Sequence, residues 1–140
     1  MVEIEASMLE LTTAQANSSL RWSYEQEKLK RFSAFRPVGV GSNITAAMGA
    51  LETQVGNTYG IRLELLNFPY ARPTVFPRDW TPHPAVPHRF NDGSLCVMRS
   101  NQWRLHFTVA LVIAKVAIWL GKYEIWKRNG HIWPGLGQSH

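Results

Sequence analysis

The first third of the chain carries apolar residues at a helical spacing. Residues 14–31 contain neither Gly nor Pro, and Leu20 and Tyr24 lie four positions apart. This spacing predicts a helix with both side chains on one face, because residues four apart are neighbours on a helix surface. Thr12 and Thr13 stand just before it, where a hydroxyl side chain caps free backbone amides.

The middle of the chain is typical of short strands. Apolar residues occupy every second position from 61 to 65, which is the period of a half-buried strand. Gly56 and Asn57 predict a turn before it, Pro37 limits an earlier segment to a sheet edge, and Gly49 marks a bulge or close contact. Short strands joined by short turns pair antiparallel, because parallel pairing needs long crossovers. We therefore predict a four-stranded antiparallel meander, within residues 32–40, 43–54, 59–66 and 74–76.

A proline-rich segment follows the predicted sheet. Prolines recur from Pro69 to Pro87, and proline at this density excludes a helix. Asn91, Asp92 and Gly93 then form a strong turn signal just before Cys96. We therefore expect Cys96 at the end of an ordered loop, with its thiol displayed at the surface.

The last third of the chain is typical of helices. Residues 107–120 are apolar over so much of the helix surface that we expect cover on more than one side. Gly121 predicts a break, followed by a short helix or turn over 123–128 that ends at Asn129 and Gly130. Together these elements predict one α+β domain over residues 1–140, with irregular termini at 1–12 and 131–140.

Composition and charge narrow the class of protein. A chain of 140 residues, 45% of them hydrophobic, is long enough for one core. A single cysteine excludes a disulfide framework and any multi-cysteine metal cage. The net charge is +5, and residues 61–140 hold ten basic residues against four acidic ones. A basic half of this kind can bind an acidic protein, nucleic acid or a membrane surface, or it can simply keep the chain soluble.

The segment most like a membrane span is too short to be one. The apolar stretch over 107–120 is interrupted by Lys115, whereas a helical span needs roughly 20 residues. The N-terminal residues are acidic and no apolar run follows them, so no secretory signal is visible. We expect a cytoplasmic protein without a membrane partner.

Cys96 is the most interesting candidate for chemistry. A lone cysteine is usually a small buried hydrophobe, and its flanking Leu95 and Val97 would suit that role too. Arg89 and Arg99 lie nearby in sequence and would lower its pKa, which favours the reactive thiolate.

Two histidines and a tryptophan near Cys96 also need an explanation. His88 either stabilises an oxyanion formed at Cys96 or bonds backbone groups of its loop. The spacing of His83, His88 and Cys96 fits no zinc pattern, so we expect neither metal nor cofactor. We expect Trp103 to cover the Cys96 loop, and His106 to pack or cap at the start of the apolar helix.

The order of these features resembles the ubiquitin-conjugating enzyme (E2) family. In that family a strand ends in a Phe-Pro step, a His-Pro-Asn triplet follows, and the catalytic cysteine stands in a Gly-x-(Ile/Leu)-Cys context with a Trp soon after. Here the matching features are Phe68-Pro69, Val86-Pro87-His88, Gly93-Ser94-Leu95-Cys96 and Trp103, within a stretch from Tyr59 to Leu120.

One departure points to a narrower group. His88 stands where the family has Asn, as in the bacterial E2-like branch of CBASS anti-phage operons, where the protein accompanies a cGAS-like nucleotidyltransferase. The ending Trp133-Pro134-Gly135 and the terminal His140 are similar to that branch as well. The resemblance implies an E2-like fold: an N-terminal helix, the meander, an active-site loop and C-terminal helices.

The resemblance also implies a conjugating activity. Cys96 would hold the C-terminus of a partner protein, the nucleotidyltransferase first among candidates, as a thioester for transfer to an acceptor protein. His88 would stabilise the oxyanion, and Asp92 would orient the incoming amine or simply make its turn. The sequence has no Gly-rich nucleotide motif, so ATP-driven activation, if required, needs a separate activating enzyme.

Other classes of function stay open on the sequence alone. The chain could be an inactive E2-fold binding module in which Cys96 is simply buried. It could also be a cysteine hydrolase that uses Cys96 with a histidine. We do not expect nucleic acid as a partner, because the aromatic residues fall at core spacing rather than along an exposed basic strand.

Overall fold

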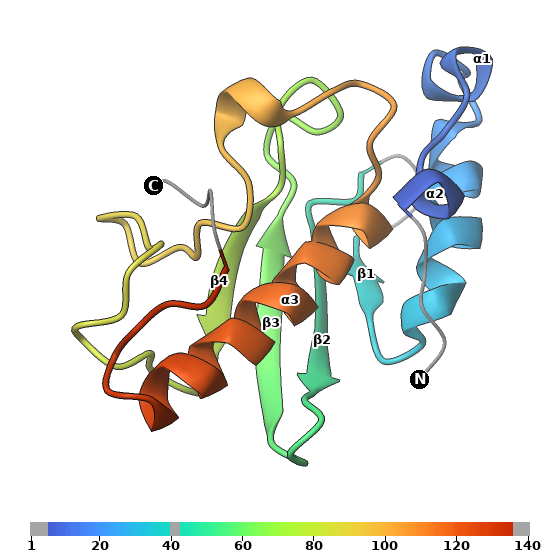
Figure 1. The fold of residues 1–140 in the computed structure, drawn as a ribbon. Coiled ribbons are helices and arrows are strands. Elements are labelled where there is room, and N and C mark those ends of the chain that lie inside the picture. The colour runs from blue at the N-terminus through green and yellow to red at the C-terminus, as the bar shows by residue number, and fades with distance from the viewer. Residues whose placement is uncertain (1–5, 40–42, 136–140) are drawn as a thin grey trace.

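A computed structural model of the chain describes residues 6–39 and 43–135. It has the predicted α+β architecture (Figure 1). The strands are β1 (Arg36–Val38), β2 (Ala46–Glu52), β3 (Thr58–Glu64) and β4 (Thr74–Arg78), and the helices are α1 (Thr13–Ala16), α2 (Arg21–Leu29) and α3 (Val109–Arg128). Short 3-10 turns occupy Ala6–Leu9, Lys30–Phe32 and Ser100–Gln102. The first of these lies in a terminus that we expected to be irregular.

The four strands form the predicted antiparallel meander. Their order in the sheet is β1-β2-β3-β4, and each strand is antiparallel to the next. Pro37 lies in the edge strand β1, as its missing amide requires. Gly49 in β2 allows a close contact, since a Cβ there would come within 2.6 Å of the Phe35 ring. Gly56, with a φ of 92°, makes the turn between β2 and β3.

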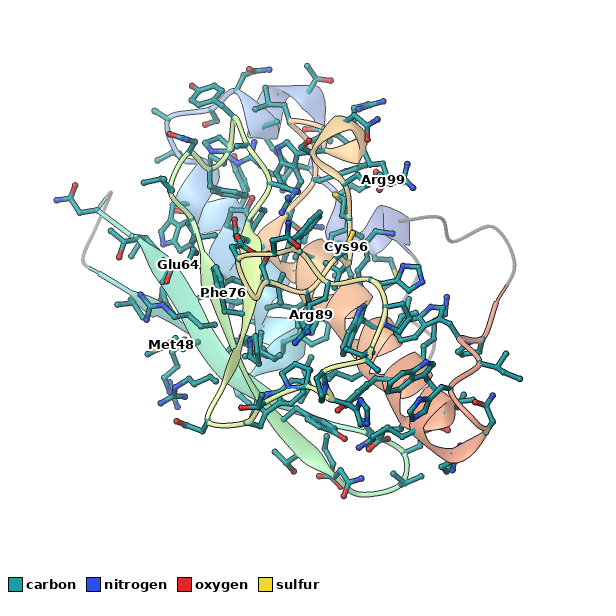
Figure 2. The ribbon with its side chains drawn as sticks, turned by 90° about the vertical axis from the view of Figure 1, so that its left-hand side faces the viewer. Met48, Glu64, Phe76, Arg89, Cys96 and Arg99 are labelled. Carbon is teal, nitrogen blue, oxygen red and sulfur yellow. The ribbon has the colours of Figure 1, made fainter. Side chains whose placement is uncertain are left out.

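The two faces of the sheet have different surroundings. Helix α3 crosses one face (Figure 1), where the inward residues of β3 and β4 form the core. Ile61, Leu63 and Val75 are fully buried there, which confirms the period-two pattern. Met48 and Phe76 lie on the other face, and Arg62 between them forms an ion pair with Glu64 (Figure 2).

Helix α3 is one continuous element, so the predicted break at Gly121 was wrong. The helix runs for 20 residues from a cap at Thr108, whose hydroxyl accepts a hydrogen bond from Leu111 N at 3.0 Å. Buried neighbours such as Leu120 hold the helix against the sheet, and this packing outweighs the low helix propensity of one glycine. The helix ends at Asn129, before Gly130, as predicted.

The N-terminal helix differs from the prediction in two ways. It is split into α1 and α2 by a turn near Ser18, and Thr12 caps only α1, in a capping box with Gln15. The buried face of α2 is not that of Leu20, which is exposed, but the face of Arg21 and Glu25 with Leu29. The prediction of the buried face was wrong because it used apolar residues alone, whereas this face buries two charged side chains.

Residues near the end of the chain continue past α3 without regular structure. Residues 131–135 form neither helix nor strand, while Met1–Glu5 and the terminal His140 lie outside the described residues. Within the described ranges, no helix combines the length and the apolar character that crossing a membrane requires.

Candidate active site

Cys96 follows a residue that is anchored to the edge of the sheet. The amide of Leu95 donates to the carbonyl of Val75 in β4 at 2.8 Å, and the two residues form an isolated β-bridge. Leu95 is almost fully buried, so its apolar side chain holds this end of the loop in the core. The next residue, Cys96, is therefore fixed beside β4.

A tight turn closes the loop just before Cys96. The amide of Phe90 donates to Ser94 O at 2.9 Å across the turn, and Gly93 has a φ of 92°. The Asp92 carboxylate accepts from both the amide and the hydroxyl of Ser94, at 2.8 and 2.6 Å. The hydroxyl is the main reason that the pKa of Asp92 lies below its usual range. Asp92 thus makes its turn, as one of its two predicted roles required.

The same hairpin brings His88 next to Cys96. Arg89 and Leu95 are bridged across it, and at the next position the amide of Cys96 donates to His88 O at 2.8 Å. The indole of Trp119, in the middle of α3, donates to the same carbonyl at 3.1 Å. His88 has a φ of 60°, a left-handed conformation that is uncommon without glycine. Two hydrogen bonds to one carbonyl hold this residue in place.

The thiol itself is covered, contrary to the expectation of a surface-displayed sulfur. Only 1% of Cys96 is exposed to solvent. Burial raises the pKa of the Cys96 thiol above its ordinary value, and the guanidinium groups of Arg72 and Arg99 offset only part of this effect. The predicted net lowering by basic neighbours was therefore wrong. In this conformation Cys96 is a protonated thiol at neutral pH.

The basic side chains that act on Cys96 are only partly those predicted from the sequence: Arg99 was predicted, and Arg72 was not. Figure 2 shows Arg89, Cys96 and Arg99 on the loops that follow β4. Arg89 donates to Pro84 O at 3.3 Å, on the preceding loop. Arg72, which the sequence analysis did not single out, lies 5.0 Å over the ring of Phe90. A residue before β4 thus contributes a positive charge to the loop.

The segment that follows α3 also contacts the site, through Trp133. The ring of Trp133 lies 4.7 Å from that of His88 and 5.5 Å from that of Trp119. Residues 131–135 turn back from the end of α3, so that Trp133 reaches Trp119 in the middle of the helix. Sequence reasoning placed Trp133 only in a terminal motif, because an irregular segment has no period that reveals its contacts.

The remaining candidates lie in other contacts. His83 donates its amide to Tyr123 Oη at 2.9 Å, and its ring packs on Trp126 and His131. Among residues 6–39 and 43–135, no three His, Cys, Asp or Glu side chains are grouped to hold a metal ion.

Trp103 and His106 stabilise other parts of the fold. Trp103 donates to Pro69 O at 2.8 Å and packs against Phe68, so it anchors the Phe-Pro step. His106 packs on Phe107 and lies 3.2 Å from a carboxylate oxygen of Glu10.

Comparison with known proteins identifies one family. The family model E2-CBASS, described as type II CBASS E2 protein, matches residues 10–140. No curated protein and no solved structure matches the chain. The matched range contains the whole meander, the Cys96 loop, helix α3 and Trp133.

Proposed function

Because this chain belongs to the type II CBASS E2 proteins and is thus an E2-like protein of anti-phage defence, we propose that it carries a partner protein as a thioester on Cys96. The observation that carries the proposal is the hydrogen bond of 2.8 Å from Cys96 N to His88 O. It fixes a nucleophile and an imidazole-bearing residue as neighbours across one hairpin. Acyl transfer through a stabilised oxyanion needs a nucleophile and a hydrogen-bond donor from neighbouring residues, and these two can supply them.

The proposed reaction has two steps. The Cys96 thiolate attacks the activated C-terminal carbonyl of the partner, delivered as a thioester or acyl adenylate. The Sγ–C bond forms as the leaving group departs with its electron pair. An acceptor amine then attacks the new thioester, the C–N bond forms, and Cys96 leaves as thiolate while the amine proton passes to solvent. His88 stabilises the oxyanion of each tetrahedral intermediate.

Loading requires a conformational change before the first step. Since Cys96 is 1% exposed, no carbonyl carbon reaches its sulfur in the covered state. Residues 131–135 contact His88 through Trp133, so they are our candidate for the segment that moves. Opening would also hydrate the thiol and remove the burial that raises its pKa.

The partner that we propose is the cGAS-like nucleotidyltransferase of the defence operon, with its C-terminus as the acyl group. The test is co-expression of this chain with the proteins encoded beside it, followed by gels with and without reductant. We expect an adduct that reductant removes and that Cys96→Ala abolishes. Cys96→Ser should give an ester that reductant leaves intact, and Ser100→Ala, at an exposed serine beyond the loop, serves as the control.

His88 is tested by separating the two steps. We expect His88→Ala to slow transfer to the acceptor more than it slows loading. Equal loss of both would assign His88 to folding of the loop. Release of processed partner without any adduct would instead favour a cysteine hydrolase, because water would then be the acceptor.

The burial of Cys96 specifically favours a second candidate, an inactive E2-fold module that binds and regulates a partner. The two are separated by alkylation of the native protein in the presence of its partners. Since the chain has one cysteine, the modified site is unambiguous. A carrier must react with iodoacetamide when its partner opens the site, whereas an inactive module stays unlabelled throughout.

A further inference from the structure

An apolar groove lies between the β2–β3 turn and the C-terminal half of α3. Its volume is about 410 Å³, and its walls include Leu51 and Val55 on the hairpin and Ile118 and Ile125 on the helix. Gly121 also lines it, and a Cβ at this position would meet no atom of residues 6–39 and 43–135 within 4 Å. Figure 1 shows this turn at the same end of the sheet as the C-terminal half of α3. We call it the hairpin–α3 groove.

The groove leaves large apolar side chains in water. Ile118 and Val55 are each 56% exposed, and Ile125 is exposed as well. Their grouping in one hollow is unlike the scattered exposed residues of an ordinary surface, and contiguous apolar patches mark binding sites. It explains why the helix is apolar over so much of its circumference: the sheet covers one side, and the groove side has no cover among the described residues.

The groove is separate from the Cys96 site. Trp119 and Tyr123 face the loop that carries His83 and His88, and they donate or accept hydrogen bonds there. Ile118 and Ile125 lie on a different face of the same helix, since successive residues are about 100° apart around its axis. An occupant of the groove would therefore lie away from the Cys96 loop.

The helix side of the groove is basic. Lys122 and Arg128 flank the apolar strip on its two sides. Glu124 turns its carboxylate toward the sheet, where it accepts hydrogen bonds from Asn57 at 2.6 Å and Tyr59 at 3.0 Å. The one other acid in the lining is Glu52, on the hairpin wall.

We propose that the hairpin–α3 groove binds an amphipathic helix of a partner protein, with apolar residues in the groove and acidic residues against Lys122 and Arg128. A helix that lays an apolar face into such a groove is a recurrent mode of recognition, and opposite charges at the rim set its specificity. A second copy of this chain suits the rim less well, because a two-fold contact brings the basic rim of one copy against that of the other.

The test uses the isotope-labelled full chain and synthetic helical peptides of about 18 residues, long enough to form a helix alone. One peptide carries Leu at positions i, i+4, i+7 and i+11 with flanking Glu, and its partner carries the same Leu pattern with flanking Lys. We expect the Glu peptide to bind with chemical-shift changes confined to residues 51–55 and 117–128. Ile118→Asp should weaken it at least about tenfold, and Lys122→Glu should reverse the preference between peptides.

Controls keep the outcome decisive. Leu66→Asp alters a side chain that is 90% exposed outside the groove, so it should bind the Glu peptide normally. Cys96→Ala should also bind normally, which separates this site from the proposed thioester chemistry. Equal binding of both peptides, shifts outside the groove, or a wild-type dimer that Ile118→Asp dissociates in the ultracentrifuge would overturn the proposal. An unchanged melting temperature of the Lys122→Glu variant would show that this variant is folded.

Discussion

The carboxylate of Glu25 accepts a hydrogen bond from the amide of Val109 at 2.9 Å, although the two residues lie 84 positions apart in the chain. Val109 is the first residue of α3, so this bond ties α2 to the start of the core helix. Arg21 completes the junction, donating to Glu25 and to the carbonyls of Leu105 and Phe107. These hydrogen bonds of the buried Arg21 and Glu25 side chains therefore hold α2 against the start of α3.

This junction predicts a pH-dependent stability. Burial raises the pKa of Glu25 from 4.5 to about 7, more than its bonds to Val109 and Arg21 lower it. The folded state therefore holds the proton more tightly, and this contribution to stability is full below pH 4.5 and is lost as the pH rises through 7. In urea unfolding, Glu25→Gln should flatten the pH dependence between pH 5 and 8 by roughly 2–3 kcal/mol. Parallel curves for the two proteins would contradict the assignment.

Two glycines should respond in opposite ways to the same substitution. In Gly49→Ala the new Cβ would meet the Phe35 ring at 2.6 Å and Ala34 O at 2.7 Å, so overpacking should cost about 1–3 kcal/mol. In Gly121→Ala the methyl group meets no atom of the described residues within 4 Å, and the better helix propensity should add about 1 kcal/mol. Thermal melts of both variants measure the contrast. Destabilisation by Gly121→Ala would mean that α3 is not helical there.

Trp133 should slow the modification of Cys96. Its ring packs on His88 and Trp119, both of which bond at the Cys96 hairpin. We expect Trp133→Ala to speed alkylation of the native thiol several-fold, as followed by mass spectrometry. Ile132→Ala, which changes an exposed neighbour in the same segment, is the matched control. Identical rates for all three proteins would assign the cover to other residues.

The role of Asp92 can be decided by an isosteric change. Asp92→Asn keeps a side-chain oxygen that can accept from Ser94, so we expect the loop and the transfer activity to survive. Asp92→Ala removes the acceptor and should cost about 1 kcal/mol in urea unfolding. A loss of transfer in Asp92→Asn with unchanged stability would show that the charge acts on the acceptor amine.

The fold was predictable where burial repeats with the period of the element. The alternation around Ile61 and Leu63 placed β3, and turn residues placed its neighbours. The fold departs from the predicted elements where tertiary contacts override local preference. Gly121 is accommodated within α3 because buried neighbours such as Leu120 hold the helix on the sheet, and α2 buries Arg21 and Glu25, which no apolar pattern reveals.

The sequence predicts which residues of the candidate site are neighbours, but it does not predict that the thiol is buried. The turn at Asp92 and the nearness of His88 to Cys96 follow from local spacing and from the E2 resemblance. Burial of the thiol and its contact with the segment of Trp133 depend on residues far away in sequence. Arg72 was not predicted for the same reason, because it precedes β4 and is distant from Cys96 in sequence although its charge acts on the thiol.

The cover over Cys96 has a consequence for durability. Peroxide and other oxidants attack accessible thiolates first, and beyond the sulfenic stage the damage is largely irreversible. A sulfur that is sequestered and protonated at rest escapes that attack. The resting protein should therefore keep its single thiol reduced at peroxide concentrations that oxidise exposed cysteines.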